Sequence, residues 1–258
     1  MKIRRATMAV VMGLVAVSVP AEAKKCPADA IQVQAVCVDK YEASVWETTD
    51  AKTIKNIQKG KIKNIGGLAL AAQHGVTGDD YGAGCPDPGT GCKTFYAVSI
   101  PGVKPAANLT WFQAAAACRN AGKRLLTNQE WQTAALGTPD PGTDNGTTDC
   151  NIASAGPANT GSRSLCISES GAFDMVGNLW EWIADWGTVA NGCDHYSASY
   201  GNDVSCVGSN TPGGLPGALL RGGDFGAGTD AGVFAISANL LNPTVSTLFF
   251  GFRCGRDL

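Results

Sequence analysis

Two stretches of the chain repeat hydrophobic residues at helical spacing. The first predicts a helix that begins after Thr110, which can act as its N-cap, and stops at Gly122. Its apolar positions recur at three- and four-residue steps, through Trp111, Ala114, Ala115 and Cys118. A second, short helix is predicted after Thr127, because Thr127 and Glu130 form a capping box in front of Trp131.

Elsewhere, short apolar runs lie between turns, which is the pattern of strands. The expected strands are residues 35–38, 95–100, 218–221, 233–237 and 248–253. Residues 77–92 hold five glycines, two prolines and three aspartates, so they predict a loop. The pattern therefore favours the α+β fold class, with much irregular chain that needs disulfides, and an ion if one is bound, to hold its loops.

Residues 171–186 do not fit either pattern. They hold three tryptophans, three acids and two glycines. The tryptophans (Trp180, Trp182 and Trp186) require burial, whereas the acids (Asp174, Glu181 and Asp185) require hydrogen bonds, a charged partner or a cation beside them. We interpret the segment as a folded, metal-assisted turn rather than a plain core strand.

The start of the chain predicts a signal peptide at residues 1–23. Basic residues come first, an apolar run follows at residues 9–19, and the small-residue pattern that ends at Ala23 predicts cleavage there. The apolar run is too short to span a membrane, and no later stretch reaches that length. We therefore expect an exported protein, periplasmic or extracellular, with no membrane span and one domain at residues 24–258.

The net charge of the chain limits the classes of partner that it is expected to bind. The chain has 20 Lys and Arg against 22 Asp and Glu, and removal of the leader, with three basic residues and one acid, leaves 17 against 21, a net charge of −4. So mildly acidic a protein is not expected to bind nucleic acid.

All ten cysteines follow the leader, and an even number in an exported chain predicts disulfides. Neither Cys-x-x-Cys spacing nor neighbouring histidines indicate a zinc site. Spacing suggests four local pairs: Cys26 with Cys37, Cys85 with Cys92, Cys150 with Cys166, and Cys193 with Cys206. Cys118 is then left for Cys254.

Four blocks of residues, taken in order, resemble the sulfatase-modifying factor family, the domain of formylglycine-generating enzymes. The blocks are Val38–Glu42; Asn108–Phe112 continued by Cys118, Gly122–Thr127 and Glu130–Trp131; Phe173–Trp182; and Leu220–Phe225 closed by Gly251–Cys254. The resemblance spans roughly residues 36–256. It implies a variant of the C-type lectin fold and a disulfide between Cys118 and Cys254.

The resemblance also implies structural calcium. The ligands of one calcium site would be Asp174, the carbonyls of Gly177 and Leu179, and Glu181. Calcium accepts six to eight oxygens from carboxylates and carbonyls, which agrees with this set. A second family site would use Asn151 and the carbonyl of Ile152, but its other ligands have no counterparts in the short loop that follows. The alternative is that Asp174 and Glu181 only hydrogen-bond the loop.

The chain departs from the family at its catalytic residues. Formylglycine-generating enzymes carry two copper-binding cysteines shortly after the Arg-Gly-Gly block, and here those positions are Ala227 and Gly232. Cu(I) prefers soft thiolate ligands, so we expect no copper. Related sulfoxide synthases hold iron with clustered histidines, whereas this chain has only His74 and His195 in separate loops, so iron is not expected.

These observations favour an exported, calcium-supported binding or structural module without catalysis. Its ligand would be a peptide, a glycan or a small molecule, bound near Trp186 and in a groove started by Arg221, Asp224 and Phe225. Equally, Arg221 can pair with a buried acid and Phe225 can fill the core. The alternative function is an enzyme of the same fold with divergent chemistry on an exported peptide or metabolite, since some exported relatives act in siderophore maturation without the cysteine pair.

Overall fold

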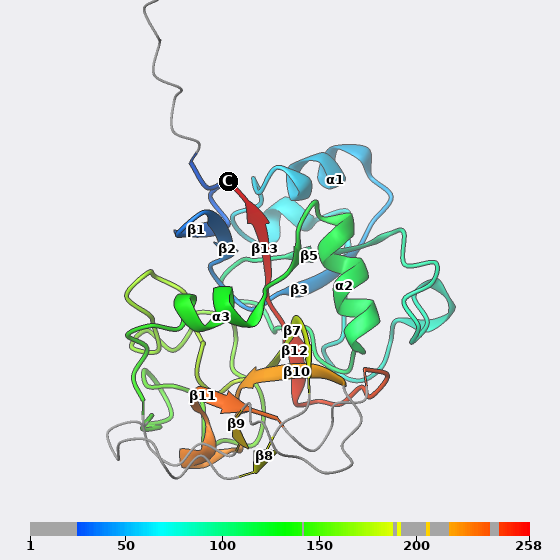
Figure 1. Ribbon diagram of the computed structural model, residues 1–258. Helices are drawn as coiled ribbons and strands as arrows, with labels where there is room; N and C mark the ends of the chain where they lie inside the picture. The colour runs from blue at the N-terminus through cyan, green and yellow to red at the C-terminus, as the bar shows by residue number, and fades with distance from the viewer. Residues whose placement is uncertain (1–24, 141, 188–189, 192–204, 207–216, 238–242) are drawn as a thin grey trace, which may run out of the picture.

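The computed structural model describes residues 25–140, 142–187, 190–191, 205–206, 217–237 and 243–258. Short strands and helices alternate with long irregular segments, and the C-terminal strands β12 and β13 run through the middle of the molecule (Figure 1). Within the described ranges, no helix is long and apolar enough to cross a membrane.

One four-stranded sheet joins the two ends of the described chain. Its strand order is β1 (Ala30–Val33), β2 (Val36–Asp39), β13 (Cys254–Asp257) and β6 (Arg124–Leu125), and all its pairs are antiparallel. The C-terminal strand therefore lies between an N-terminal strand and a strand from mid-chain. This placement brings Cys254 beside the end of α2.

The second four-stranded sheet has the order β11 (Gly232–Ile236), β10 (Gly217–Gly222), β7 (Trp180–Gly187) and β12 (Phe250–Phe252). Strands β10 and β7 are antiparallel, and β12 pairs with β7 in parallel. The interpretation of residues 171–186 as a turn is thus wrong for its second half, which forms the interior strand β7. Trp182 is fully buried, but Trp186 is 46% exposed and does not pack into the core.

The remaining strands form smaller sheets. Strand β3 (Ser44–Glu47) lies between β4 (Ala72–His74) and β5 (Phe95–Val98), and β8 (Ala190–Asn191) pairs with β9 (Ser205–Cys206). The strand expected at residues 248–253 begins only at Phe250, because Leu248 and Phe249 lie in an exposed turn.

The two predicted helices are present with their predicted caps. Helix α2 (Trp111–Asn120) begins after Thr110, and α3 (Asn128–Ala134) begins after Thr127, each with a complete capping box. Helix α1 (Ala51–Gln58) was not predicted, because its sequence is mostly polar and buries only Thr53 and Ile57. Three short 3-10 turns, η1 (Ile65–Leu68), η2 (Gly82–Gly84) and η4 (Gly228–Asp230), lie in the loops.

Four disulfides close the described chain: Cys26–Cys37, Cys85–Cys92, Cys118–Cys254 and Cys150–Cys166. Each is a predicted pair. The predicted pair of Cys193 and Cys206 involves Cys193, which lies outside the described residues, and it stays a prediction. The Cys85–Cys92 bridge closes the glycine-rich loop at residues 77–92, as expected. The predicted α+β, loop-rich and disulfide-stapled architecture is therefore confirmed.

Candidate functional site

The turn at residues 174–178 has an unusual backbone. Asp174, Gly177 and Asn178 all have positive φ, between 60° and 75°. A Cβ on Gly177 would lie 2.5 Å from the carbonyl oxygen of Asn151, so only glycine fits there. The close approach lets the Asn178 amide donate to the same carbonyl at 2.8 Å. The turn is thereby fixed against the loop that contains the second predicted ligand pair.

Glu181 is paired with Arg253 in the interior. The Glu181 Oε1 atom lies 2.8 Å from Arg253 Nη2, and both side chains are at most 1% exposed. Arg253 Nε approaches both carboxylate oxygens at 3.2 Å, and the indole of Trp131 donates to Oε2 at 2.7 Å. Burial of the Glu181 charge is therefore compensated by protein donors.

Two further buried acids flank this pair. Glu42 accepts hydrogen bonds from the Leu179 amide at 3.1 Å and from the Asn178 side chain. Burial, together with the charges of Asp174 and Glu181, raises the pKa of Glu42 well above its usual range. Asp174 accepts from the Gly161 amide at 2.9 Å, and burial raises the pKa of Asp174 to about 7. Three buried carboxyl groups therefore lie around the turn, and the raised pKa values of Glu42 and Asp174 mean that these two acids favour the protonated, uncharged form.

The first predicted calcium site partly fits these contacts. Asp174 and the carbonyls of Gly177 and Leu179 lie on the same turn, and a carboxyl group with backbone carbonyls is a donor set that suits a hard divalent cation. Glu181, in contrast, already has both oxygens bonded by Arg253 and Trp131. No three His, Cys, Asp or Glu side chains of the described chain form a cluster that could hold a metal. The predicted calcium site contains only two carboxylates, those of Asp174 and Glu181, so the absence of a cluster of three among the described residues does not test it. The site stays a prediction.

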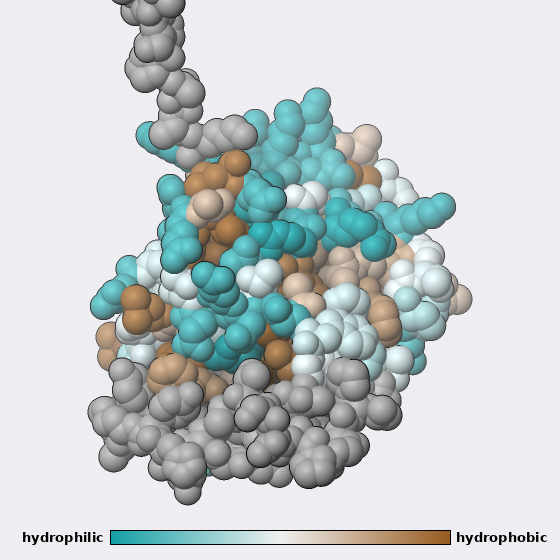
Figure 2. Space-filling view, viewed as in Figure 1, coloured by the Kyte–Doolittle hydropathy of each residue, from teal (hydrophilic) through white to brown (hydrophobic). Residues whose placement is uncertain are grey.

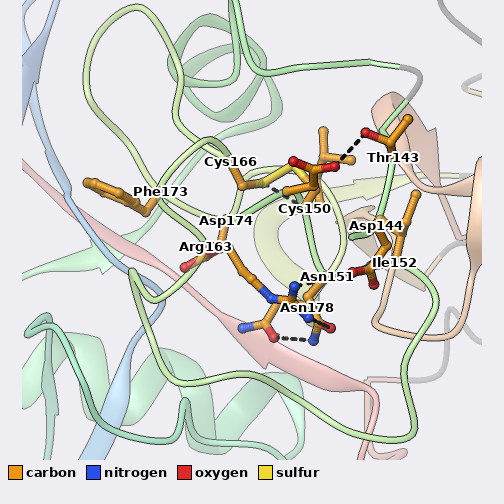
Figure 3. The surroundings of a disulfide bond; sticks show 12 residues. Thr143, Asp144, Cys150, Asn151, Ile152, Arg163, Cys166, Phe173, Asp174 and Asn178 are labelled. Carbon is orange, nitrogen blue, oxygen red and sulfur yellow. Dashed lines mark hydrogen bonds and ion pairs between the residues drawn. A yellow bond between two sulfur atoms is a disulfide. The ribbon is translucent and has the colours of Figure 1, made fainter. Parts of the chain in front are cut away.

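The second predicted pair is bonded by the protein itself, as Figure 3 shows around the Cys150–Cys166 disulfide. Asn151 Oδ1 accepts from Arg163 Nη2 at 2.9 Å, and the Ile152 carbonyl accepts from the Gly228 amide at 2.7 Å. Arg163 is 6% exposed and also pairs with Asp144 at 3.2 Å. A guanidinium therefore lies on the oxygen that a cation would need, and these residues do not fit a second calcium ion.

Arg221 does not face a groove. Its side chain is 3% exposed and lies over the ring of Trp131, 4.4 Å from the centroid. It donates to the carbonyls of Ala235 at 2.9 Å and Val233 at 2.7 Å, and to the side chain of Asn128. Arg221 therefore joins β10, β11 and α3.

Asp224 lies closer to the surface than Arg221, whereas Phe225 is buried. The carboxylate of Asp224 accepts from the Gly226 amide at 2.7 Å and interacts with the Trp180 side chain, and burial raises the pKa of Asp224. Phe225 is 4% exposed and stacks on Phe249, with 5.2 Å between ring centroids. Phe249 is 42% exposed, so it presents the aromatic surface that was expected of Phe225. Because Phe249 lies in an apolar run, the sequence had placed it in a strand at residues 248–253.

The positions of the family cysteines lie in a tightly packed loop. Ala227 precedes η4 and is half-buried, whereas Gly232 is buried at the start of β11. A Cβ on Gly223 would lie 2.5 Å from the Cβ of Ala231, so the two arms of the loop touch through small residues. No sulfur atom belongs to residues 207–253, so the loop itself supplies no thiolate.

A separate cavity lies between α2, β6 and β7. Its volume is about 380 Å³, and its lining residues include Trp111, Ala115, Arg119, Arg124 and Ala184. Trp186 stands beside it, with its ring centroid 5.4 Å from that of Trp111. The sequence had suggested the surface near Trp186 as a binding region, and the structure places an open cavity there.

The fold and the site define a disulfide-stapled α+β domain in which a turn at residues 174–178 leads into the tryptophan-rich strand β7 and lies beside buried acids. Residues 4–258 match the family model of the sulfatase-modifying factor enzyme 1-like domain. The chain belongs to this family, which confirms the predicted family and its formylglycine-generating-enzyme variant of the C-type lectin fold.

Named relatives include enzymes and a binding protein. The formylglycine-generating enzyme of Streptomyces coelicolor is 30% identical over 174 residues, which cover 59% of this chain and 52% of the enzyme. The tail fiber receptor-binding protein of Bordetella phage BPP-1 is 30% identical over 146 residues, covering 55% of this chain and 35% of that protein. Among solved structures, the Major Tropism Determinant U1 variant aligns with a TM-score of 0.45 at 20% identity, covering 90% of this chain and 54% of its own. The chain spans about half or less of the curated relatives it matches.

Proposed function

We propose that this protein is an exported, calcium-supported binding module of the sulfatase-modifying factor family that does not generate formylglycine. The observation that carries this proposal is the identity of Ala227 and Gly232 at the positions of the two copper-binding cysteines. A methyl group and a hydrogen atom cannot ligate Cu(I), which requires soft sulfur ligands.

The relatives and the disulfides support the remaining parts of the proposal. One relative is named as a phage tail fiber receptor-binding protein, and this similarity supports a binding role for the present chain. The four disulfides between described residues suit an oxidising compartment outside the cytoplasm. Export to the periplasm or beyond the cell is part of this proposal.

Calcium would support the turn at Asp174. Asp174 and the carbonyls of Gly177 and Leu179 would hold the ion, whose positive charge would keep the buried carboxyl group of Asp174 ionised. Because Arg163 and the Gly228 amide already bond the second predicted pair, we propose one calcium ion per chain rather than two.

A Cu(I) titration of the purified, oxidised protein tests the absence of the family's redox site. The protein should compete poorly with a Cu(I) chelator, as a cysteine-free loop predicts. Stoichiometric Cu(I) binding that withstands the chelator would contradict the proposal. The Streptomyces coelicolor enzyme provides the matched positive control.

One observation favours a second candidate function, an enzyme with divergent chemistry on an exported peptide or metabolite. Asp224 is half-buried and interacts with the Trp180 side chain, and burial raises the pKa of Asp224, as in many general acids. Incubation with candidate extracts, followed by mass spectrometry of wild type against Asp224→Asn, tests this alternative. A product that only the wild type forms would establish it.

A further inference from the structure

The cavity between α2, β6 and β7 has the dimensions of a small-molecule site. Its volume of about 380 Å³ lies within the range of ligand pockets, and most of its lining is apolar. In Figure 2, hydrophobic residues are visible among hydrophilic ones in the area between α2 and α3. One face of α2 supplies Trp111, Ala115 and Arg119, which are spaced by four residues and therefore line one side.

The aromatic end of the cavity is fixed in place. The indole N–H of Trp111 donates to the Ile183 carbonyl at 2.7 Å, which anchors the ring to β7. The Trp186 ring packs edge-on against it at 5.4 Å and stays 46% exposed. Because the Trp111 N–H is already used, its ring offers π surface rather than a hydrogen bond. Ala115 and Ala184 leave space beside it.

The other end of the cavity is cationic, but only one of its charges is uncompensated. Lys123 lies 2.7 Å from Asp29 and 2.5 Å from Asp39, so its charge is neutralised in the interior. Arg124 is held by Glu130 and Asp257, each at 2.7 Å. Arg119 is exposed and forms no ion pair with any described residue. The guanidinium of Arg119 therefore stands at the cavity with its charge and its fork of donors available.

We propose that this cavity binds a small aromatic carboxylate, with its ring against Trp111, Ala115 and Ala184 and its carboxylate on the guanidinium of Arg119. This inference rests on the proposed binding function and names its ligand class. The aromatic group suits the apolar, tryptophan-lined end, and the anion complements Arg119, the lining cation that forms no ion pair with a described residue. A rigid ring also loses little conformational entropy on binding.

Binding of 3-phenylpropionate to the full protein, measured by tryptophan fluorescence and isothermal calorimetry, tests the proposal. The uncharged 3-phenylpropanamide is the matched ligand control, because it keeps the ring and removes the anion. We expect saturable binding of the carboxylate with a Kd of about 1 mM or tighter, and weaker binding of the amide.

Two variants locate the site. Arg119→Gln should weaken carboxylate binding by about threefold to tenfold and leave amide binding unchanged. Ala115→Leu fills the cavity and should weaken both ligands. Lys55→Gln and Ala51→Leu, on the exposed side of α1, are the matched controls and should bind like wild type. Thermal unfolding confirms that each variant is folded.

Three results would overturn the inference: no binding of the carboxylate, equal binding of carboxylate and amide, or equal loss in the α1 controls. None of these results bears on Ala227 and Gly232, so the absence of formylglycine chemistry is judged by copper binding and peptide conversion alone. Selective binding that Arg119→Gln weakens would support the inference.

Discussion

The carboxylate of Glu181 on β7 lies 2.8 Å from the guanidinium of Arg253, and neither side chain is more than 1% exposed. Arg253 also donates to the carbonyls of Asp39 at 3.0 Å and Phe173 at 2.6 Å. One buried cation thus joins strand β7, the N-terminal sheet and the residue that precedes the turn at residues 174–178. The stability of the fold should depend on it more than on any exposed charge.

Replacing Arg253 by methionine should destabilise the protein strongly. The substitution leaves Glu181 as an unpaired buried charge, which costs roughly 3–5 kcal/mol in comparable cases. The measurement is urea unfolding, followed by tryptophan fluorescence. Arg119→Met, on an exposed site, should stay within about 0.5 kcal/mol of wild type. Equal effects of the two substitutions would show that the Glu181–Arg253 pair has no special role.

The protein should bind one calcium ion per chain. Metal analysis after dialysis against calcium should give a ratio near one, and Asp174→Asn should reduce it, because it removes the buried carboxylate of the turn. Asn151→Ala should leave the ratio unchanged, since Asn151 Oδ1 is bonded by Arg163. A ratio of two, or loss of an ion in Asn151→Ala, would contradict the assignment. A ratio of zero in the wild-type protein would contradict the proposal that it binds calcium.

Two disulfides should differ in their contribution to stability. The cysteines of the Cys118–Cys254 bridge are 136 residues apart, and those of Cys85–Cys92 are 7 apart. On the chain-entropy model, removal of the long closure costs about 5 kcal/mol and removal of the short one about 2.5 kcal/mol. Paired Cys→Ala variants in urea unfolding measure both values. A larger loss for the short bridge would contradict this account.

Asp39 should make stability fall as pH rises from about 4 to 6. Burial raises the pKa of Asp39 to about 6, against the attraction of Lys123. The folded state therefore holds a proton that the unfolded state has already released in this window, and the free energy of unfolding decreases with rising pH. Asp39→Asn should flatten this part of the profile.

The control for the pH profile is Asp50. Its carboxylate caps α1 by accepting from the Thr53 amide at 2.7 Å, and this backbone hydrogen bond lowers the pKa of Asp50. Its contribution has the opposite sign and is lost as pH falls through the lowered pKa. Asp50→Asn should therefore not flatten the rise in stability between pH 6 and 4. If Asp39→Asn and Asp50→Asn change the profile in the same way, the assignment to Asp39 is wrong.

The features that the sequence predicted well are those determined by residues close together in the chain. The caps at Thr110 and Thr127, the glycine-rich loop and the short disulfides all depend on neighbouring residues, and the structure contains each of them. The turn at Gly177 was also foreseen. Its close approach to Asn151, however, depends on the tertiary fold.

Apart from the Cys118–Cys254 disulfide, the long-range partners could not be predicted from the sequence. Glu42 and Arg253 lie in the family blocks, but no pattern indicated what they or Arg163 contact, because these contacts join segments far apart in the chain. Strand β7 was missed for a similar reason: its acids suggest a turn until Arg253 and Trp131 are placed beside Glu181. The cavity at Trp111 also arises only when α2, β6 and β7 meet.

The most direct measurement is the conversion of a sulfatase-motif peptide by the purified protein with copper and oxygen, followed by mass spectrometry. With Ala227 and Gly232 in place of the copper-binding cysteines, the peptide cysteine should remain unchanged, while the Streptomyces coelicolor enzyme converts it under the same conditions. Formation of the aldehyde peptide by this protein would contradict the central claim that it is a binding module without formylglycine chemistry.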